Sequence, residues 1–271
     1  MAELLCEEPV VLAKATRDGI VADIREALGG VQVLRNDGEA LHLALEGCPV
    51  EYEDGEVVPA QILFLSDASP HRNPDPQKAA ATLETSLGQT WGWDAARDVV
   101  ANAPHTLLVT DFLSTGLDPR RRIAIFSKVL YAAAKHIPCA ALHFPSSQCL
   151  LRPEDFLAAA PDDPDHYPLL GLVNVRLYAV EGSEDEIVMD TLGLHVFGLP
   201  DVQCHCSGAD PDELGNWLYT LADVIAETDR DFEDGVSVEA FDGSRMRLRY
   251  AEPLVEPGRF VLDLQPAYQE E

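Results

Sequence analysis

Residues 189–205 read Met189-Asp-Thr-Leu-Gly-Leu-His-Val-Phe-Gly-Leu-Pro-Asp-Val-Gln-Cys-His205, and no other stretch of the chain is as distinctive. The pattern predicts the end of a strand, a short helix over residues 191–197, and a second strand that starts at Val202. Asp190 is placed to accept hydrogen bonds from the first amides of the short helix. Gly198 suits a left-handed helix exit, and Pro200 prevents the helix from continuing. We therefore expect Asp190, Gly198 and Pro200 to have structural roles.

The segments around this stretch predict strands that accompany one helix. We expect four strands, over residues 172–180, 186–189, 245–250 and 260–264. The turn Glu181–Asp185 joins the first two as an antiparallel pair. Strict alternation in the third turns Met246, Leu248 and Tyr250 toward the core and its three arginines outward. Between the two pairs, Asp210 precedes a helix in which Glu213 completes a capping box. The apolar stripe of this helix consists of Leu214, Trp217, Leu218, Leu221, Val224 and Ile225.

The first part of the chain alternates strands with helices. Val10–Ala15 reads as its first strand, and Asp118 followed by Pro119 is an N-cap with proline at the first helical position. The apolar face of that helix consists of Ile123, Phe126, Val129, Leu130 and Ala133. Asp162–Pro168 is polar and contains prolines, which is typical of a linker. The sequence therefore predicts an α+β protein of two sandwich-like units, 1–160 and 168–271, with mixed sheets covered by helices. A ferredoxin-like plan is one candidate for both units.

The stretch from Asp190 onward resembles the bacterial domain of unknown function 4261 family, whose members carry a similar Asp-Thr-x-Gly-Leu…Gly-Leu-Pro-Asp-x-Gln-Cys-His segment. The motif positions in this chain are Asp190, Gly193, Gly198, Pro200, Asp201 and His205. The similarity continues to Phe260–Leu264, and Gln89–Asp94 and Leu107–Asp111 are similar to the upstream region of the family, so it covers most of residues 77–266. The resemblance implies no reaction and no catalytic residue. The resemblance implies only a weak association, because some relatives lie among bacterial toxin–immunity or secretion-associated genes.

The charge of the chain limits the partners that we expect. Its 271 residues include 47 acids and 19 bases, a formal net charge of −28, and residues 161–271 alone hold 25 acids against 6 bases. Contact with phosphate backbones needs a basic footprint. The small one present consists of Arg120, Arg121, Arg122, Lys128 and Lys135, which we interpret as the solvated face of a helix. Neither nucleic acid nor an anionic membrane is therefore an expected partner.

The densest acidic segment is the candidate binding surface, and it contains Glu227, Asp229, Asp231, Glu233 and Asp234. A strongly negative surface attracts basic partners and speeds their association. The acidic start of the chain lacks the basic region of a secretory signal, and no run reaches the roughly 18 apolar residues that cross a bilayer. The leading hypothesis is a cytoplasmic, non-enzymatic binding protein, an immunity or adaptor protein that engages a basic toxin or effector. The sequence leaves the oligomeric state open, and a host with a salty cytoplasm is the alternative explanation of the charge.

The second hypothesis is a small-molecule hydrolase or transferase that uses the segment from Asp190 to His205. Acid and base groups are close in sequence there, because His195, Asp201 and Cys204 lie between them. No GxSxG, P-loop, GxGxxG or HExxH motif accompanies them. We therefore expect no catalytic residue, and an enzyme is the less favoured interpretation.

Two further groups of residues have side chains suited to catalysis or metal binding. His143, with Ser146 and Ser147, follows a buried strand, a frequent position for sites in α/β proteins. Cys204-His205-Cys206 is the only cluster with the side chains of a metal site. In a strand, however, the two thiols share one face and His205 points to the other. We therefore expect no metal and no cofactor.

Overall fold

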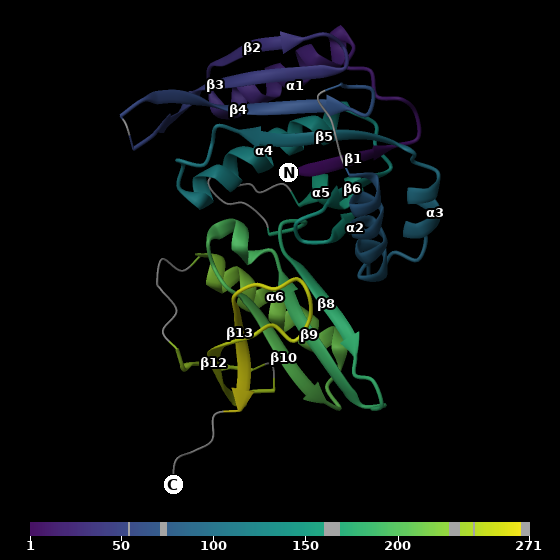
Figure 1. Cartoon of the computed structure of the whole chain (residues 1–271), viewed down its shortest axis with the longest axis vertical. Helices are drawn as coiled ribbons and strands as arrows, with labels where there is room; N and C mark the ends of the chain where they lie inside the picture. Colours follow the sequence, from purple (N-terminus) through teal and green to yellow (C-terminus); the bar gives the residue numbers. More distant parts are fainter. Residues whose placement is uncertain (54, 71–74, 160–168, 228–233, 241, 267–271) are drawn as a thin grey trace. The chain divides into compact units, whose positions relative to one another are not determined.

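The chain forms two compact units, Met1–Gly171 and Leu172–Glu271. The computed structural model describes residues 1–53, 55–70, 75–159, 169–227, 234–240 and 242–266 (Figure 1). The segment predicted as a linker, Asp162–Pro168, lies outside the described residues. Helices and strands are both abundant, and each unit is built on one sheet. The α+β class predicted from the sequence is therefore confirmed.

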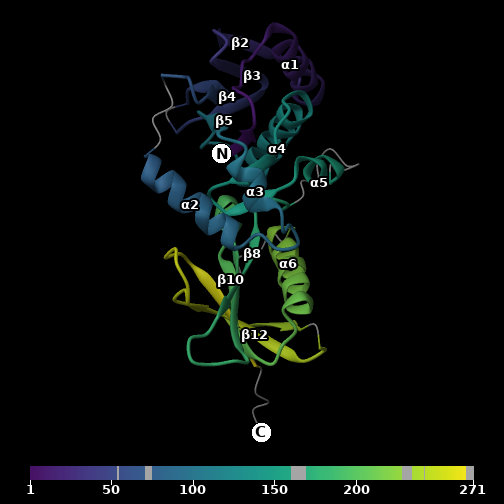
Figure 2. The same ribbon diagram turned by 90° about the vertical axis from the view of Figure 1, so that its right-hand side faces the viewer.

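The first unit is a seven-stranded sheet with helices on both of its faces. Its elements are β1 (Ala2–Cys6), α1 (Lys14–Leu28), β2 (Val31–Asn36), β3 (Ala40–Glu51), β4 (Val57–Ser66), α2 (Pro76–Gly88), α3 (Ala96–Ala101), β5 (His105–Phe112), α4 (Pro119–His136), β6 (Ala141–Phe144), β7 (Cys149–Leu151) and α5 (Pro153–Ala158). The strand order is β2-β3-β4-β5-β1-β6-β7, and every pair of neighbours is antiparallel. Helices α1 and α4 lie together on one face of this sheet (Figure 2).

Helix α4 forms as its sequence predicts. The Asp118 carboxylate accepts hydrogen bonds from the backbone amides of Arg120 and Arg121, and Pro119 is the first helical residue. These contacts satisfy two of the amides that a helix leaves open at its N-terminus. All five residues of the predicted apolar face are buried: Ile123, Phe126, Val129, Leu130 and Ala133.

The prediction of a strand over Val10–Ala15 is wrong. The first strand is β1, which lies in the sheet between β5 and β6 and buries Leu4 and Leu5. Among the described residues, the segment before α1 makes one backbone hydrogen bond toward the sheet, from the Leu12 amide to the carbonyl of Gly38 in the turn between β2 and β3. One such bond does not form a ladder. Leu12 is nevertheless buried, so this apolar run serves as a packed entry into α1.

The second unit is a six-stranded sheet that packs against one long helix. Its elements are β8 (Asn174–Ala179), β9 (Glu186–Leu192), the 3₁₀-helix η1 (Leu194–Phe197), β10 (Asp201–Ser207), α6 (Pro211–Glu227), β11 (Val236–Glu239), β12 (Arg245–Ala251) and β13 (Val261–Pro266). The strand order is β11-β12-β13-β10-β9-β8, with β10 and β13 parallel and the other neighbours antiparallel. A ferredoxin-like unit has the order βαββαβ. Three strands, one helix and three strands form a different plan, so the ferredoxin-like expectation is wrong for this unit.

Helix α6 confirms its predicted start and most of its core stripe. The Asp210 carboxylate accepts hydrogen bonds from the amides of Asp212 and Glu213. Leu214, Leu218, Leu221 and Ile225 are buried, whereas Val224 at the edge of the stripe is 53% exposed. Tyr250, also expected in the core, is 51% exposed. It lies on β12, while α6 packs on β8, β9 and β10. Leu248 of the same strand is 0% exposed, so the predicted alternation holds at Leu248 and fails at Tyr250, next to the end of the strand.

None of the helices that the structure describes combines the length and hydrophobicity needed to cross a bilayer.

Candidate functional site

The distinctive stretch forms the end of β9, the 3₁₀-helix η1 and the start of β10. Asp190 lies inside β9, which continues to Leu192, and Gly193 separates the strand from η1. The expectation that Asp190 caps the short helix is therefore wrong. Its place is taken by Asp201, whose Oδ1 accepts a hydrogen bond of 3.0 Å from the Leu194 amide. The capping carboxylate comes from the first residue of β10, because this strand runs back beside β9.

Asp190 is held instead by a buried arginine from the neighbouring strand. The antiparallel register of β8 and β9 places Arg176 directly opposite Asp190. Arg176 donates from Nε to Oδ1 at 2.9 Å and from Nη2 to Oδ2 at 2.5 Å, a two-point contact between side chains that are both 0% exposed. The guanidinium also lies 5.4 Å from the centre of the Tyr178 ring. Such forked pairs are the strongest geometry that an arginine and a carboxylate can adopt.

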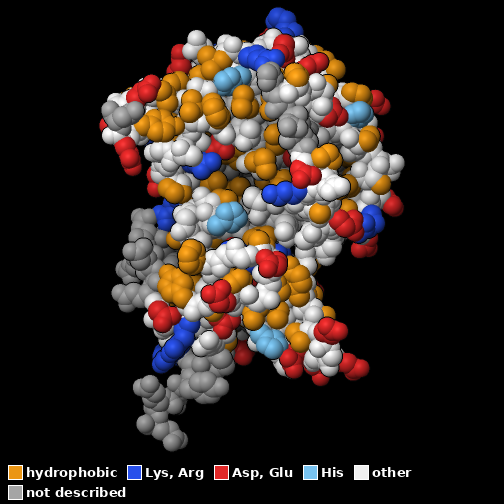
Figure 3. Space-filling view, viewed as in Figure 1, with side chains coloured by type: hydrophobic (Ala, Val, Ile, Leu, Met, Phe, Trp, Pro, Cys, Tyr) orange, Lys and Arg blue, Asp and Glu red, His pale blue; other side chains and the backbone are white. Residues whose placement is uncertain are grey.

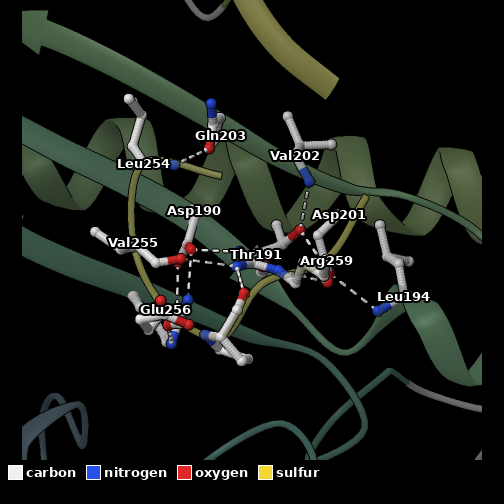
Figure 4. Close-up of polar contacts among 12 residues, drawn as sticks. Asp190, Thr191, Leu194, Asp201, Val202, Gln203, Leu254, Val255, Glu256 and Arg259 are labelled. Carbon is white, nitrogen blue, oxygen red and sulfur yellow. Dashed lines mark hydrogen bonds and ion pairs between the residues drawn. The ribbon is translucent and has the colours of Figure 1, made fainter. Parts of the chain in front are cut away.

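A second arginine completes the network from a segment that is distant in sequence. We call residues 252–260, between β12 and β13, the strap. Arg259 of the strap donates from Nη2 to Asp190 Oδ2 at 2.5 Å and from Nε to Asp201 Oδ2 at 3.1 Å (Figure 4). Two guanidinium groups thus meet two carboxylates, and their charges cancel.

Backbone contacts attach the strap at further points. Arg176 Nη1 donates to the Glu256 carbonyl at 2.9 Å. Gln203, on β10, donates from its amide nitrogen to the Glu252 carbonyl. Its amide oxygen accepts from the Leu254 amide (Figure 4). The strap lies on the face of the sheet opposite α6 (Figure 2). This face is therefore closed over a polar layer, while the other face is closed by an apolar helix stripe.

The network has no group left for chemistry. Both oxygens of Asp190 accept from arginines, and Asp201 Oδ1 also accepts from the Thr191 hydroxyl at 3.1 Å. Burial raises the pKa of Asp201, while the Leu194 amide and the charge of Arg259 act in the opposite direction. A general acid or base must present an oxygen to a substrate. These carboxylates face only the protein, so their arrangement indicates a structural role.

Three of the remaining motif residues, Gly193, Gly198 and Pro200, shape the connection between β9 and β10. Gly193 has φ +141°, and a Cβ there would lie 2.0 Å from the Leu172 carbonyl oxygen. Gly198 has φ +74° and ends η1 in the left-handed conformation, as predicted. Pro200 directly precedes β10. His205 lies on the surface, where its Nε2 is 2.8 Å from Glu186 Oε2.

One family model matches part of the second unit. The model of one family, described as Domain of unknown function (DUF4261), matches residues 190–265. This match lies within the second unit. The match confirms the resemblance predicted from the sequence over these residues, and the similarity proposed for 77–189 stays a prediction. No curated protein and no solved structure matches the chain.

The DUF4261 match includes Asp190, Asp201 and Arg259 of the network but begins after Arg176. In this chain the fourth member of the network therefore precedes the matched residues. Strand β8, which carries Arg176, belongs to the same sheet as the matched strands. The structural unit consequently extends from Leu172, upstream of the segment that defines the family.

The groups of the hydrolase hypothesis do not assemble around the DUF4261 motif. Among the described residues, no hydrogen bond or ion pair joins Asp190, His195 and His205. Burial raises the pKa of the Cys204 thiol to about 12, so it is not a nucleophile at neutral pH. Cys204 is buried while the adjacent His205 is exposed, as strand alternation predicts. These positions give no acid–base pair that a substrate can reach.

In the first unit, His143 lies in a chain of side chains that has the order of a hydrolytic triad. Its Nδ1 is 3.0 Å from Glu3 Oε2, and its Nε2 is 3.0 Å from the Ser86 hydroxyl. Ser86, however, is 0% exposed and donates its single proton to the Thr82 carbonyl at 2.9 Å. A nucleophilic serine must reach a substrate and transfer that proton to the histidine. The arrangement therefore ties α2 to β1 and β6.

The predicted binding residues border the segment that follows α6. Glu227 is the last residue of α6 and is exposed. Asp234 is exposed ahead of β11, and its Oδ1 accepts from the Tyr250 amide at 3.0 Å. Asp229, Asp231 and Glu233 lie outside the described residues. The two described members thus mark the ends of a connection between the helix and the second half of the sheet.

We expect Asp190→Asn to lower the free energy of unfolding of the second unit by about 3–5 kcal/mol, because it leaves Arg176 buried without a full counter-charge. Glu186→Gln on the same strand is the control, and its exposed contact to His205 is worth less than about 1 kcal/mol. Native-state hydrogen exchange of the β9 and β10 amides measures both. Equal effects of the two substitutions would contradict a structural role of the network.

Gly193→Ala tests the close approach at the entry to η1. We expect it to lower the free energy of unfolding of the second unit by more than Gly198→Ala, which serves as the matched control. Both residues have positive φ, but a Cβ at Gly198 meets nothing within 4 Å. Strain alone costs about 1–2 kcal/mol, and only Gly193→Ala adds a clash with the Leu172 carbonyl. Chemical denaturation that gives the same loss for both variants would contradict the clash.

Proposed function

We propose that the chain is a cytoplasmic, non-enzymatic binding protein whose acidic DUF4261 unit engages a basic protein. The partner is a toxin or effector domain that this unit neutralises or escorts. The observation that carries the proposal is the placement of acidic residues at the C-terminal end of α6.

Acids at the start of α6 stabilise the helix. Asp212 and Glu213 lie in its first turn, and Asp210 caps it. The N-terminus of a helix carries partial positive charge, so acidic side chains there are favourable. These residues are explained by the fold itself.

Acids at the other end of α6 have the opposite effect. The last turn contains no basic residue, Glu227 closes the helix, and the acidic segment up to Asp234 follows it. The C-terminus of a helix carries partial negative charge, so each carboxylate near it opposes the dipole by about 0.3–1 kcal/mol. Helix stability therefore does not account for them. A cationic surface placed against this end would relieve the repulsion.

The buried network strengthens the surface charge of the second unit. Residues 161–271 contain 25 acids and 6 bases. Arg176 and Arg259 form ion pairs with Asp190 and Asp201 inside the unit. Subtracting these two pairs leaves 23 acids and 4 bases for the rest of the segment. The visible face of this unit is accordingly dotted with acidic side chains and has few basic ones (Figure 3).

This arrangement favours fast capture of a basic partner. Like charges gathered on one surface steer an oppositely charged protein and raise its association rate at low salt. Occlusion of the partner's active cleft would then follow from contact, without a reaction on this chain. The closed network around Asp190 is consistent with that division, because it provides a rigid support and no catalytic group.

The test compares three baits expressed in the protein's own host and captured at near-physiological salt. One bait is the wild type. The second carries Glu227→Gln, Asp229→Asn, Asp231→Asn, Glu233→Gln and Asp234→Asn. The third is a control with the same change in net charge, placed on exposed acids elsewhere in the unit: Glu181→Gln, Glu184→Gln, Asp185→Asn, Glu239→Gln and Glu252→Gln.

We expect one basic protein to co-purify in stoichiometric amount with the wild type and the control, and to be lost from the second bait. Its association rate with the second bait should fall at least tenfold at low salt, and the difference should shrink as salt rises. The free energy of unfolding of the second bait should be unchanged or slightly raised. An identical set of bound proteins for all three baits would contradict the proposal, and equal loss from both variants would show that only net charge matters.

A further inference from the structure

The first unit contains a hollow of about 510 Å³ that is unusual for so acidic a chain. It lies where the end of α1, the middle of β3 and the first half of α4 meet. Its volume falls in the range of small-molecule sites, about 300–1,000 Å³. The lining residues are Ala27, Leu28, Gly47, Cys48, Arg120, Arg121, Ala124, Ile125 and Lys128.

The charge of the lining is opposite to that of the protein. Three of the nine lining residues are basic and none is acidic, in a chain with 47 acids and 19 bases. Two other bases of α4 are neutralised, since Arg122 pairs with Asp111 and Lys135 pairs with Asp23. Arg121 and Lys128 differ from them, because within the described part of the chain neither forms an ion pair or a side-chain hydrogen bond. Arg121 is exposed and Lys128 is half-buried, so both agree with the interpretation as a solvated helix face, and both also line the hollow.

The backbone of β3 forms the floor of the hollow. The register between β3 and β4 shifts between Leu45 and Pro49, and Gly47 lies in this irregular part. A Cβ at Gly47 would lie 2.1 Å from the Leu28 carbonyl oxygen, so only glycine allows the strand to pass this close to the end of α1. The side chains that remain around it are apolar or a thiol, as in Leu28, Ile125 and Cys48.

The two free cations act on the same point of the floor. Cys48 is buried, and burial raises the pKa of its thiol. The charges of Arg121 and Lys128 both oppose that rise. Arg121, Lys128 and Cys48 line the same hollow, so both positive charges act inside it.

We propose that this hollow binds a small phosphate monoester with an apolar body. Arginine offers a planar fork that matches two phosphate oxygens, and lysine supplies a compact charge. A phosphate monoester carries about −1.5 to −2 charges at neutral pH, which two cations balance. Its apolar part would lie on Leu28 and Ile125. The site belongs to the first unit and is independent of the acidic surface proposed above.

The experiment titrates the isotope-labelled full-length chain with phenyl phosphate, inorganic phosphate and phenol at constant ionic strength, followed by backbone amide chemical shifts. The variant is Arg121→Gln with Lys128→Gln. The control is Lys14→Gln with Lys78→Gln, which removes the same charge from exposed positions of the same unit, outside the hollow.

We expect saturable shifts with phenyl phosphate that centre on Gly47, Cys48 and Arg121, weaker binding of inorganic phosphate, and none of phenol. The double variant should bind phenyl phosphate at least tenfold more weakly, and the control should match the wild type. The wild-type titration decides the question even if the double variant does not fold. No saturation, shifts centred elsewhere, or equal loss in the control would overturn the site, and equal affinity for both phosphates would overturn the assignment to an ester.

Discussion

The forked ion pair between Arg176 and Asp190 is the interaction on which the second unit depends. It joins β8 to β9, and through Arg259 it extends to the strap and to Asp201 on β10. Burying a charge is costly unless a counter-charge and hydrogen bonds replace water. In this network the two arginines and the two aspartates provide the counter-charges and hydrogen bonds that water would otherwise supply. Loss of any one of the four side chains leaves an unbalanced charge in the interior, so the choice of residue at each of these positions depends on the other three.

The buried network and the acidic surface divide the work of the unit. Inside, charges are matched and hydrogen bonds are complete, so the residues at the heart of the DUF4261 motif hold the fold. Outside, acidic residues outnumber basic ones, and Glu227 places a carboxylate at the C-terminal end of α6, where its charge opposes the helix dipole. A motif that is distinctive in sequence is thus explained by structure, and the proposed binding function rests on residues that have no motif.

The sequence predicts elements whose signals are local. Helices α4 and α6 begin where an aspartate and a proline mark their starts, and Gly198 ends η1 as expected. The Arg176–Asp190 pair can also be predicted from the sequence, because a hairpin whose turn is centred on Ser183 places these two residues opposite each other. The contact of Arg259 with Asp190 cannot, since the two residues are 69 positions apart and only the tertiary fold brings them together. The wrong assignment of Asp190 as a cap followed from treating a local pattern without this partner.

The most direct test is a double-mutant cycle on Arg176 and Asp190 in the free energy of unfolding of the second unit. Arg176→Met and Asp190→Leu each leave an unbalanced charge in the interior, whereas the double variant restores neutrality and leaves Arg259 with Asp201. The account predicts that the double variant is more stable than the sum of the single losses by about 2–3 kcal/mol. Additive losses would show that the two side chains do not depend on each other, and would contradict the network as the central constraint.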